Sequence, residues 1–225
     1  MLGFKEVIVV SRTKLEGLDL MFSKHNVSGR WVVPDGRIVP VASNTARAEA
    51  PFMIAFDLNR DKERVFTKSA VRQLLDASDT PVIVLPREID QSVSRQETVL
   101  SHIIFATDWS KASEKAFQYI LAFKDVIKAL EVVNVVSRKL SVRNMRDIKQ
   151  RLTDTRRRFV DHRIDAEVHV YAGKRPKEIM LAARDYGASC IVMGGNGKGP
   201  LKRILFSDCA GQVAGGAMVP TLVVP

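Results

Sequence analysis

Short apolar runs alternate with helical patterns along the C-terminal half of the chain, and this alternation restricts its fold most. Five runs, at residues 102–106, 131–136, 166–171, 189–193 and 220–224, have the composition of buried strands. Apolar residues at helical spacing predict helices at 113–124, 142–161 and 177–186. Strands joined by helices of this length form parallel crossovers. We therefore predict an α/β domain with a parallel five-stranded sheet and helices on both faces.

Residues 1–97 follow a less regular pattern. Strands are predicted at 6–10, 52–58 and 81–86, short helices at 15–22 and 66–75, and a hairpin over 30–41. The hairpin is suggested by the turn signal Pro34-Asp35-Gly36 between β-branched runs. The polar segment 87–96 shows no apolar period and is predicted to be a linker. We therefore divide the chain into a smaller α/β domain at 1–97 and a main domain at 98–225.

The composition is that of an ordinary globular protein, with 46% hydrophobic and 27% charged residues. No apolar run approaches the roughly 20 residues of a membrane span, and the N-terminus does not resemble a signal peptide. The cysteines, Cys190 and Cys209, lack a C-x-x-C spacing, and the four histidines form no ligand pair at helical spacing. We expect a cytoplasmic protein with no membrane partner, no metal site and a buried Cys190 thiol.

The net charge of +10 is concentrated in residues 98–225, which contain 21 Lys and Arg against 12 Asp and Glu. A basic excess suits an anionic ligand or a nucleic acid, or serves solubility alone. Eight of the basic residues lie in or next to the predicted long helix: Arg143, Arg146, Lys149, Arg151, Arg156, Arg157, Arg158 and Arg163. Three aspartates interrupt them, and the one aromatic residue among them, Phe159, lies on the apolar face of the predicted helix, so we favour a solvated helix face over a nucleic-acid footprint.

A glycine-rich stretch, Met193-Gly194-Gly195-Asn196-Gly197-Lys198-Gly199-Pro200, directly follows a predicted buried strand. Glycines at this point let backbone amides approach a phosphate, although a plain tight turn has the same composition. Asp108 ends the first strand of the domain and Val135 lies near the end of the second. Carboxyl ends of parallel strands meet at one edge of the sheet, so an acceptor beside apolar side chains would suit a purine there. Asp108 could equally cap the following helix.

Four segments in order and spacing resemble the universal stress protein family: Ile104-Phe105-Ala106-Thr107-Asp108, Val133-Asn134-Val135-Val136, Ala172 to Ile179, and Gly187 to Gly194. The resemblance covers about 125 residues and implies an adenine nucleotide α-hydrolase-like fold. ATP-binding members carry G-x₂-G-x₉-G-[ST] after the fourth strand, and Gly194 and Gly197 match its first two glycines. The candidate nucleotide-binding residues are Ala106, Thr107, Asp108, Val135, Met193, Gly194, Gly197, Ser207 and Asp208.

Ser207-Asp208 stands where those members have Gly-Ser or Gly-Thr. A carboxylate about 4 Å from a phosphate charge costs about 1 kcal/mol in bulk water and about 4 at an effective dielectric constant of 20. Asp208 could instead cap the next helix. The resemblance therefore implies a stress-response or signalling protein that binds ATP or AMP weakly or not at all, with Mg²⁺ accompanying ATP. The alternatives are slow ATP hydrolysis, for which no catalytic residue stands out, and association with nucleic acid.

The segments 80–86 and 219–225 echo each other in sequence. With the family resemblance, this echo suggests a tandem protein whose residues 1–97 are a degenerate first copy. Both segments are short, apolar and bounded by prolines, so an unpaired edge would invite aggregation. Universal stress proteins dimerise through this last strand, so the resemblance implies that 82–85 and 221–224 pair in antiparallel, as an intramolecular pseudo-dimer or across a homodimer.

Overall fold

The computed structural model describes residues 6–10, 27–34, 38–57, 68–86, 99–136, 142–195 and 209–225. The chain forms two compact units, Met1–Pro51 and Phe52–Pro225, of which the second contains the large sheet. None of the helices described is both long and apolar enough to cross a membrane.

The first unit contains a two-stranded parallel sheet, of β1 (Glu6–Val10) and β2 (Ser28–Val32), and the helix α2 (Ile38–Glu49). The strand at 6–10 is confirmed, whereas the hairpin predicted over 30–41 is wrong. Its second half begins α2, because Val39, Ser43 and Ala46 recur at helical spacing and are buried along one helix face. The helix predicted at 15–22 lies outside the described residues.

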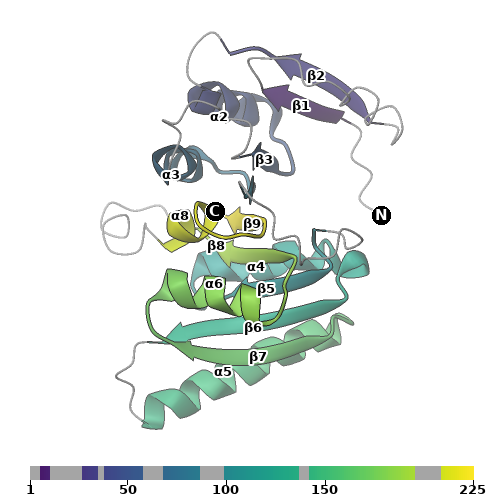
Figure 1. Ribbon diagram of the computed structural model, residues 1–225. Coiled ribbons are helices and arrows are strands. Elements are labelled where there is room, and N and C mark those ends of the chain that lie inside the picture. Colours follow the sequence, from purple (N-terminus) through teal and green to yellow (C-terminus); the bar gives the residue numbers. More distant parts are fainter. Residues whose placement is uncertain are drawn as a thin grey trace. The chain divides into compact units, whose positions relative to one another are not determined.

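The second unit is built on a seven-stranded sheet of order β3-β4-β9-β8-β5-β6-β7 (Figure 1). The strands are β3 (Ile54–Asp57), β4 (Val82–Leu85), β5 (His102–Ala106), β6 (Ala129–Val136), β7 (Ala166–Ala172), β8 (Cys190–Gly194) and β9 (Thr221–Val224). From β9 to β7 all neighbours are parallel, which confirms the predicted five-stranded sheet.

Two further strands extend this sheet beyond β9. Strand β4 pairs with β9 in antiparallel, with Val82 opposite Val223, which confirms the predicted pairing, and β3 lies parallel to β4. The compact units consequently divide after Pro51 and not at residue 97, because β3 and β4 are hydrogen-bonded into the C-terminal sheet. Whether residues 1–97 descend from a first copy remains a prediction.

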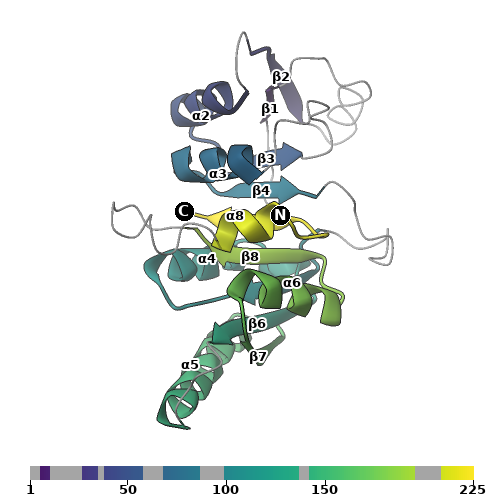
Figure 2. The same ribbon diagram turned by 60° about the vertical axis from the view of Figure 1, so that its left-hand side comes forward.

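Helices cover both faces of the sheet. Helices α4 (Lys111–Leu121) and α5 (Val142–Asp161) share one face, where Phe117 of α4 packs on Phe159 of α5 with ring centroids 4.4 Å apart. Helices α6 (Arg175–Asp185) and α8 (Cys209–Ala214) contact each other on the opposite face, and α3 (Lys68–Ala77) contacts α8. Figures 1 and 2 show α6 in front of the sheet and α4 behind it. This arrangement follows from right-handed crossovers, since the chain reverses its direction across the sheet after β7.

Several basic side chains of α5 pack against their own domain. The Arg158 guanidinium lies 3.8 Å from the Phe117 ring centroid and pairs with the Glu114 carboxylate of α4. Arg156 donates to the Ala166 carbonyl at 2.7 Å. Part of the basic excess of this helix therefore serves to hold α5 on the sheet.

Candidate functional site

A cleft of about 1030 Å³ lies at the carboxyl ends of β5, β6 and β8. The chain runs from β5 to β6 and β7 on one side, whereas β8 and β9 lie on the other side. Strand β5 is therefore the topological switch point, where neighbouring loops diverge and open sheets bind their ligands. Asp108 follows β5 and Gly194 ends β8, and both line the cleft.

Six of the nine residues predicted from the sequence line this cleft: Ala106, Thr107, Asp108, Val135, Met193 and Gly194. They come from three different strands and the segment after β5, so the structure brings them together as the strand-end argument predicted. Gly197, Ser207 and Asp208 lie outside the described residues.

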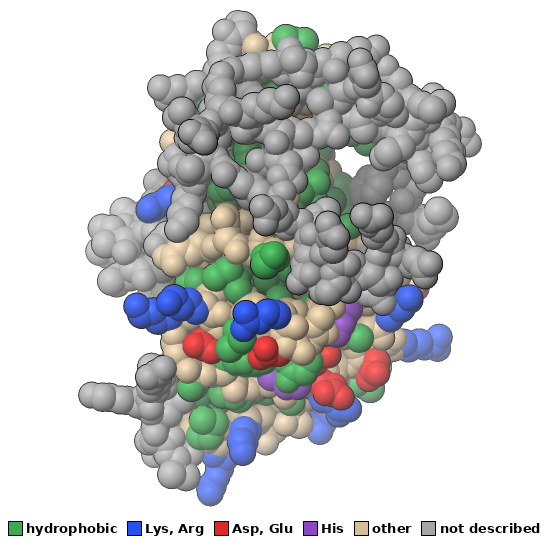
Figure 3. All heavy atoms as spheres, in the orientation of Figure 1, with side chains coloured by type: hydrophobic (Ala, Val, Ile, Leu, Met, Phe, Trp, Pro, Cys, Tyr) green, Lys and Arg blue, Asp and Glu red, His purple; other side chains and the backbone are tan. Residues whose placement is uncertain are grey.

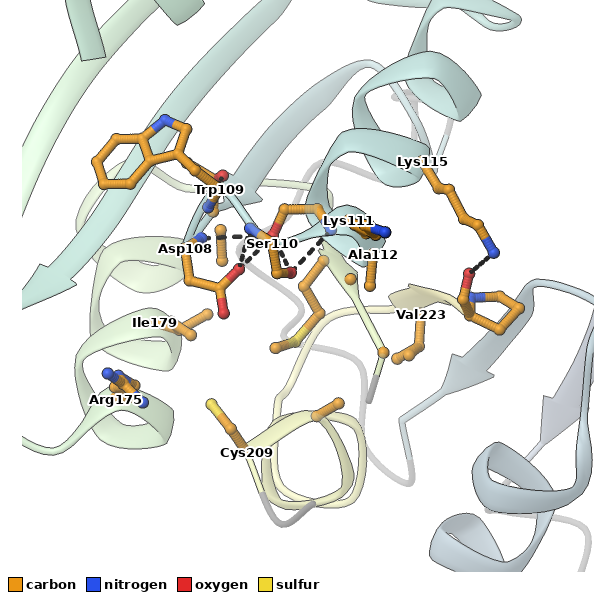
Figure 4. Close-up of a pocket in the computed structure, with 18 of the residues that line it drawn as sticks. Asp108, Trp109, Ser110, Lys111, Ala112, Lys115, Arg175, Ile179, Cys209 and Val223 are labelled. Carbon is orange, nitrogen blue, oxygen red and sulfur yellow. Dashed lines mark hydrogen bonds between the residues drawn. The ribbon is translucent and has the colours of Figure 1, made fainter. Parts of the chain in front are cut away.

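Asp108 is held by a local turn that leaves part of its carboxylate open to the cleft (Figure 4). Its Oδ1 accepts hydrogen bonds from the Ser110 amide at 2.9 Å and the Ser113 hydroxyl at 2.8 Å. Partial burial would raise the pKa of the Asp108 carboxyl, but the hydrogen bonds from Ser110 and Ser113 outweigh it and hold the pKa below its usual value. The carboxylate is therefore charged at neutral pH and available as an acceptor.

The helix cap is Ser110, so the suggestion that Asp108 caps this helix is wrong. The Ser110 hydroxyl accepts from the Ser113 amide at 3.2 Å, and α4 begins at Lys111, two residues before the predicted start. Asp108 lies two residues before the cap and accepts from the Ser110 amide, so it fixes the capping residue instead.

Trp109, which sequence reasoning did not single out, adopts a left-handed backbone conformation with φ 57° beside Asp108. Its indole Nε1 donates to the Thr155 hydroxyl at 3.2 Å, and the Arg151 guanidinium lies 4.5 Å from the ring centroid. A non-glycine residue in this conformation costs about 1–2 kcal/mol. These contacts with α5 compensate for the strain and fix the turn that carries Asp108.

One part of the lining is apolar. Val135, Ile148 and Ile179 approach the cleft from β6, α5 and α6, together with the buried Met193 of β8. The buried Asn134 amide donates to the Thr107 carbonyl at 2.7 Å and so joins the ends of β5 and β6. A flat aromatic base suits such a surface, with Asp108 at its edge.

The charged lining residues carry more positive than negative charge. In the part of the lining that the structure describes, four are basic, Lys111, Lys115, Arg151 and Arg175, and three are acidic, Asp76, Asp79 and Asp108; Lys115 donates to the Pro225 carbonyl at 3.0 Å. Figure 4 shows Lys111 and Arg175 on two different helices around the cleft. Both are the first residues of helices that follow strands, a sequence position that could have identified them. An anionic ligand is favoured at this site.

Gly194 has a packing role that needs no ligand. A Cβ atom at this position would lie 2.5 Å from the Ser113 amide nitrogen and 2.6 Å from the Ala112 carbonyl carbon. Only glycine therefore lets α4 approach the end of β8 so closely. The first glycine of the motif builds the wall of the cleft.

Residues 100–225, more than half of the chain, match a family model that is described as the universal stress protein family. No curated protein sequence matches the chain. A universal stress protein structure from Archaeoglobus fulgidus covers 98% of this chain and 86% of that chain, with 18% identity and a TM-score of 0.71.

A functionally unknown protein from Pseudomonas aeruginosa covers 98% of this chain and 82% of that chain, with 15% identity and a TM-score of 0.65. A universal stress protein in complex with cAMP covers 56% of this chain and 98% of that chain, with 17% identity and a TM-score of 0.48. At these identities the likeness to the Archaeoglobus fulgidus and Pseudomonas aeruginosa structures concerns the fold.

Proposed function

The chain belongs to the universal stress protein family, and we propose that its cleft binds an adenine nucleotide, ATP or AMP. The observation that carries the proposal is the position of Asp108 and the cleft at the switch point of the sheet. The second carboxylate oxygen of Asp108 would accept a hydrogen bond from the adenine amino group. Val135, Met193 and Ile179 would contact the base.

The phosphates would lie toward the basic side chains. Lys111 and Arg175 stand at the first turns of α4 and α6, where the helix dipoles add favourable partial charge. Mg²⁺ would accompany ATP. We expect weak binding, since Ser207-Asp208 stands in place of the Gly-Ser or Gly-Thr of ATP-binding members. Replacing Ser207 with Gly and Asp208 with Ser should tighten ATP binding at least about tenfold, as about 1.4 kcal/mol of repulsion is relieved.

We propose a binding role in stress response or signalling in preference to catalysis. The described lining of the cleft contains no histidine or glutamate, and its central carboxylate, Asp108, has a lowered pKa. A carboxyl with a lowered pKa is a poor general base at neutral pH. The nucleotide would then act by its presence, as a signal.

Calorimetric titration with ATP and with ITP tests this proposal. Asp108→Asn keeps an oxygen for the turn with Ser110 but places an amide donor where the second oxygen faced the cleft. It should weaken ATP binding at least about tenfold, since a charge-assisted hydrogen bond contributes about 1.5–3 kcal/mol. ITP carries a carbonyl oxygen in place of the adenine amino group, so the variant should bind ITP relatively better than the parent does.

Asp125→Asn serves as the matched control, because Asp125 is exposed on the short 3₁₀ helix Lys124–Val126, outside the cleft. The control should bind ATP and ITP as the parent does. The proposed function would be overturned if the parent bound neither ATP nor AMP at about 1 mM nucleotide. A Kd of about 1 mM corresponds to a binding free energy of about −4 kcal/mol.

We also propose that β3, α3 and β4 are the remnant of a first copy and that the β4–β9 pairing is a pseudo-dimer contact within one chain. It is supported by the antiparallel register of Val82 with Val223 and by the sequence echo. Replacing the buried Val223 with Lys should speed amide exchange throughout Val82–Leu85. Unchanged exchange there would contradict this role of the strand.

A further inference from the structure

A second group of polar side chains lies away from the cleft, at the end of the sheet where β5 begins. Glu131 of β6 is 7% exposed, and its carboxylate lies between two histidines from the neighbouring strands. His102 Nε2 is 3.1 Å from Glu131 Oε1, and His169 Nε2 is 2.6 Å from Glu131 Oε2. Figure 3 shows histidine and acidic side chains gathered on this face of the molecule.

Glu167 of β7 adds a second carboxylate to this group. Glu131 and Glu167 are register partners in the β6–β7 pair, so they lie directly opposite each other. Like charges in such a pair destabilise a sheet, and burial of one of them increases the cost. A cation between them would remove this repulsion.

We propose that Glu131, Glu167 and His169 bind a divalent transition-metal ion, with Zn²⁺ as the best match. One atom from each of the three side chains lies within 4.8 Å of the others. Ligand atoms of one tetrahedral Zn²⁺ ion lie about 3.4 Å apart, since each bond is about 2.0–2.2 Å long, so side-chain rotations that bring the most distant pair about 1.4 Å closer would close the site. One imidazole nitrogen and two carboxylate oxygens suit Zn²⁺, with water in the fourth position.

The surrounding residues provide the outer contacts that metal ligands usually have. The Tyr186 hydroxyl is 2.9 Å from His169 Nδ1 and so directs Nε2 toward the carboxylates. His102 holds the other oxygen of Glu131. Such partners fix the orientation of ligating side chains and affect metal affinity about 10–100-fold. None of these residues lines the nucleotide cleft, so the site is separate from the proposed function.

The test is a Zn²⁺ titration by calorimetry and a Co²⁺ titration by visible absorption, on the full untagged chain after EDTA treatment and desalting. Every protein in this test, the parent included, has Cys209 replaced by Ser, so that this half-buried thiol does not supply a ligand. One Zn²⁺ ion should bind per chain and displace Co²⁺. Glu167→Gln should weaken binding at least about tenfold, and His169→Gln should abolish it.

Glu167 is exposed, so its substitution tests the site without depending on the folding of the His169 variant. Asp154→Asn, an exposed carboxylate of α5, is the control and should bind Zn²⁺ as the parent does. Failure of the parent to bind Zn²⁺, or unchanged binding by Glu167→Gln, would overturn the proposal. So would loss of Zn²⁺ binding in Asp108→Asn with retention in Glu167→Gln, since the ion would then lie in the nucleotide cleft.

Discussion

The two ends of the sheet hold their carboxylates in different ways. At the carboxyl end, Asp108 is fixed by partners within five residues of sequence, and it lines a wide cleft. At the amino end, Glu131 is buried between side chains of β5 and β7, 29 and 38 residues away. The first arrangement leaves an acceptor open to a ligand and should tolerate substitution. The second joins three strands, so a change there should disturb the fold.

The largest expected difference between the two ends is in cysteine reactivity, because one cysteine lies at each end. Cys190 begins β8 and is fully buried, and this burial raises the pKa of its thiol to about 12, whereas Cys209 is half-buried and lines the cleft. Native protein at pH 8 should be alkylated at Cys209, with Cys190 reacting at least about a thousandfold more slowly. Peptide mass spectrometry after iodoacetamide treatment measures both rates. Comparable rates would mean that the amino end opens readily.

Removing each carboxylate should reveal the difference in stability. Glu131→Ala leaves two imidazoles without their acceptor, and a buried polar group without a partner costs about 1–3 kcal/mol. We expect a loss of at least about 2 kcal/mol in the free energy of unfolding by urea, measured in EDTA. Asp108→Ala loses only local turn contacts and should cost about 1 kcal/mol. An equal loss of unfolding free energy in both variants would contradict the difference between the two ends of the sheet.

Replacing glycines at the carboxyl end with alanine should change the stability of the fold in opposite directions, according to the space around each glycine. Gly194→Ala drives a Cβ into backbone atoms of α4, so it should destabilise the fold by about 1–3 kcal/mol without any ligand present. At Gly211 of α8 a Cβ would have its nearest neighbour at 4.0 Å. Gly211→Ala should therefore stabilise by about 0.5–1 kcal/mol. Thermal unfolding of both variants decides whether Gly194 has the packing role assigned to it.

The smallest expected effect is the pH dependence contributed by Asp108. Because its folded pKa lies below the usual value, its charged form stabilises the fold above about pH 4, and this stabilisation is lost as pH falls through the folded pKa. The parent should therefore exceed Asp108→Asn in stability most at neutral pH and approach it in acid. A gap that widens in acid would mean that the pKa is raised.

Sequence patterns predicted the elements that one apolar period defines, and the contacts that follow from where the strands begin and end. The helix over 142–161 and the strand over 102–106 were placed correctly, because one apolar period governs each of them. The six cleft residues followed from the rule that strand ends meet, which needs only the strand boundaries. The pairing of 82–85 with 221–224 followed from the family resemblance together with the need of both segments to cover an edge.

Other features depend on contacts that a linear pattern does not contain. His102, Glu131, His169 and Tyr186 come from separate elements, and each alone resembles an ordinary strand or helix residue. The β-branched residues after Pro34 suggested a strand, but burial at helical spacing decided the outcome. The left-handed backbone at Trp109 is compensated by contacts with α5, 42 and 46 residues away.

Photolabelling with 8-azido-ATP tests most directly whether the carboxyl-end cleft binds an adenine nucleotide. The protein is irradiated with the probe, digested and mapped by mass spectrometry, with and without excess ATP. We predict ATP-protected labelling on peptides that contain 106–113, 133–136 or 193–195, which line the cleft. Labelling that ATP does not reduce, or that falls on other peptides alone, would contradict the assignment of this cleft as the nucleotide site.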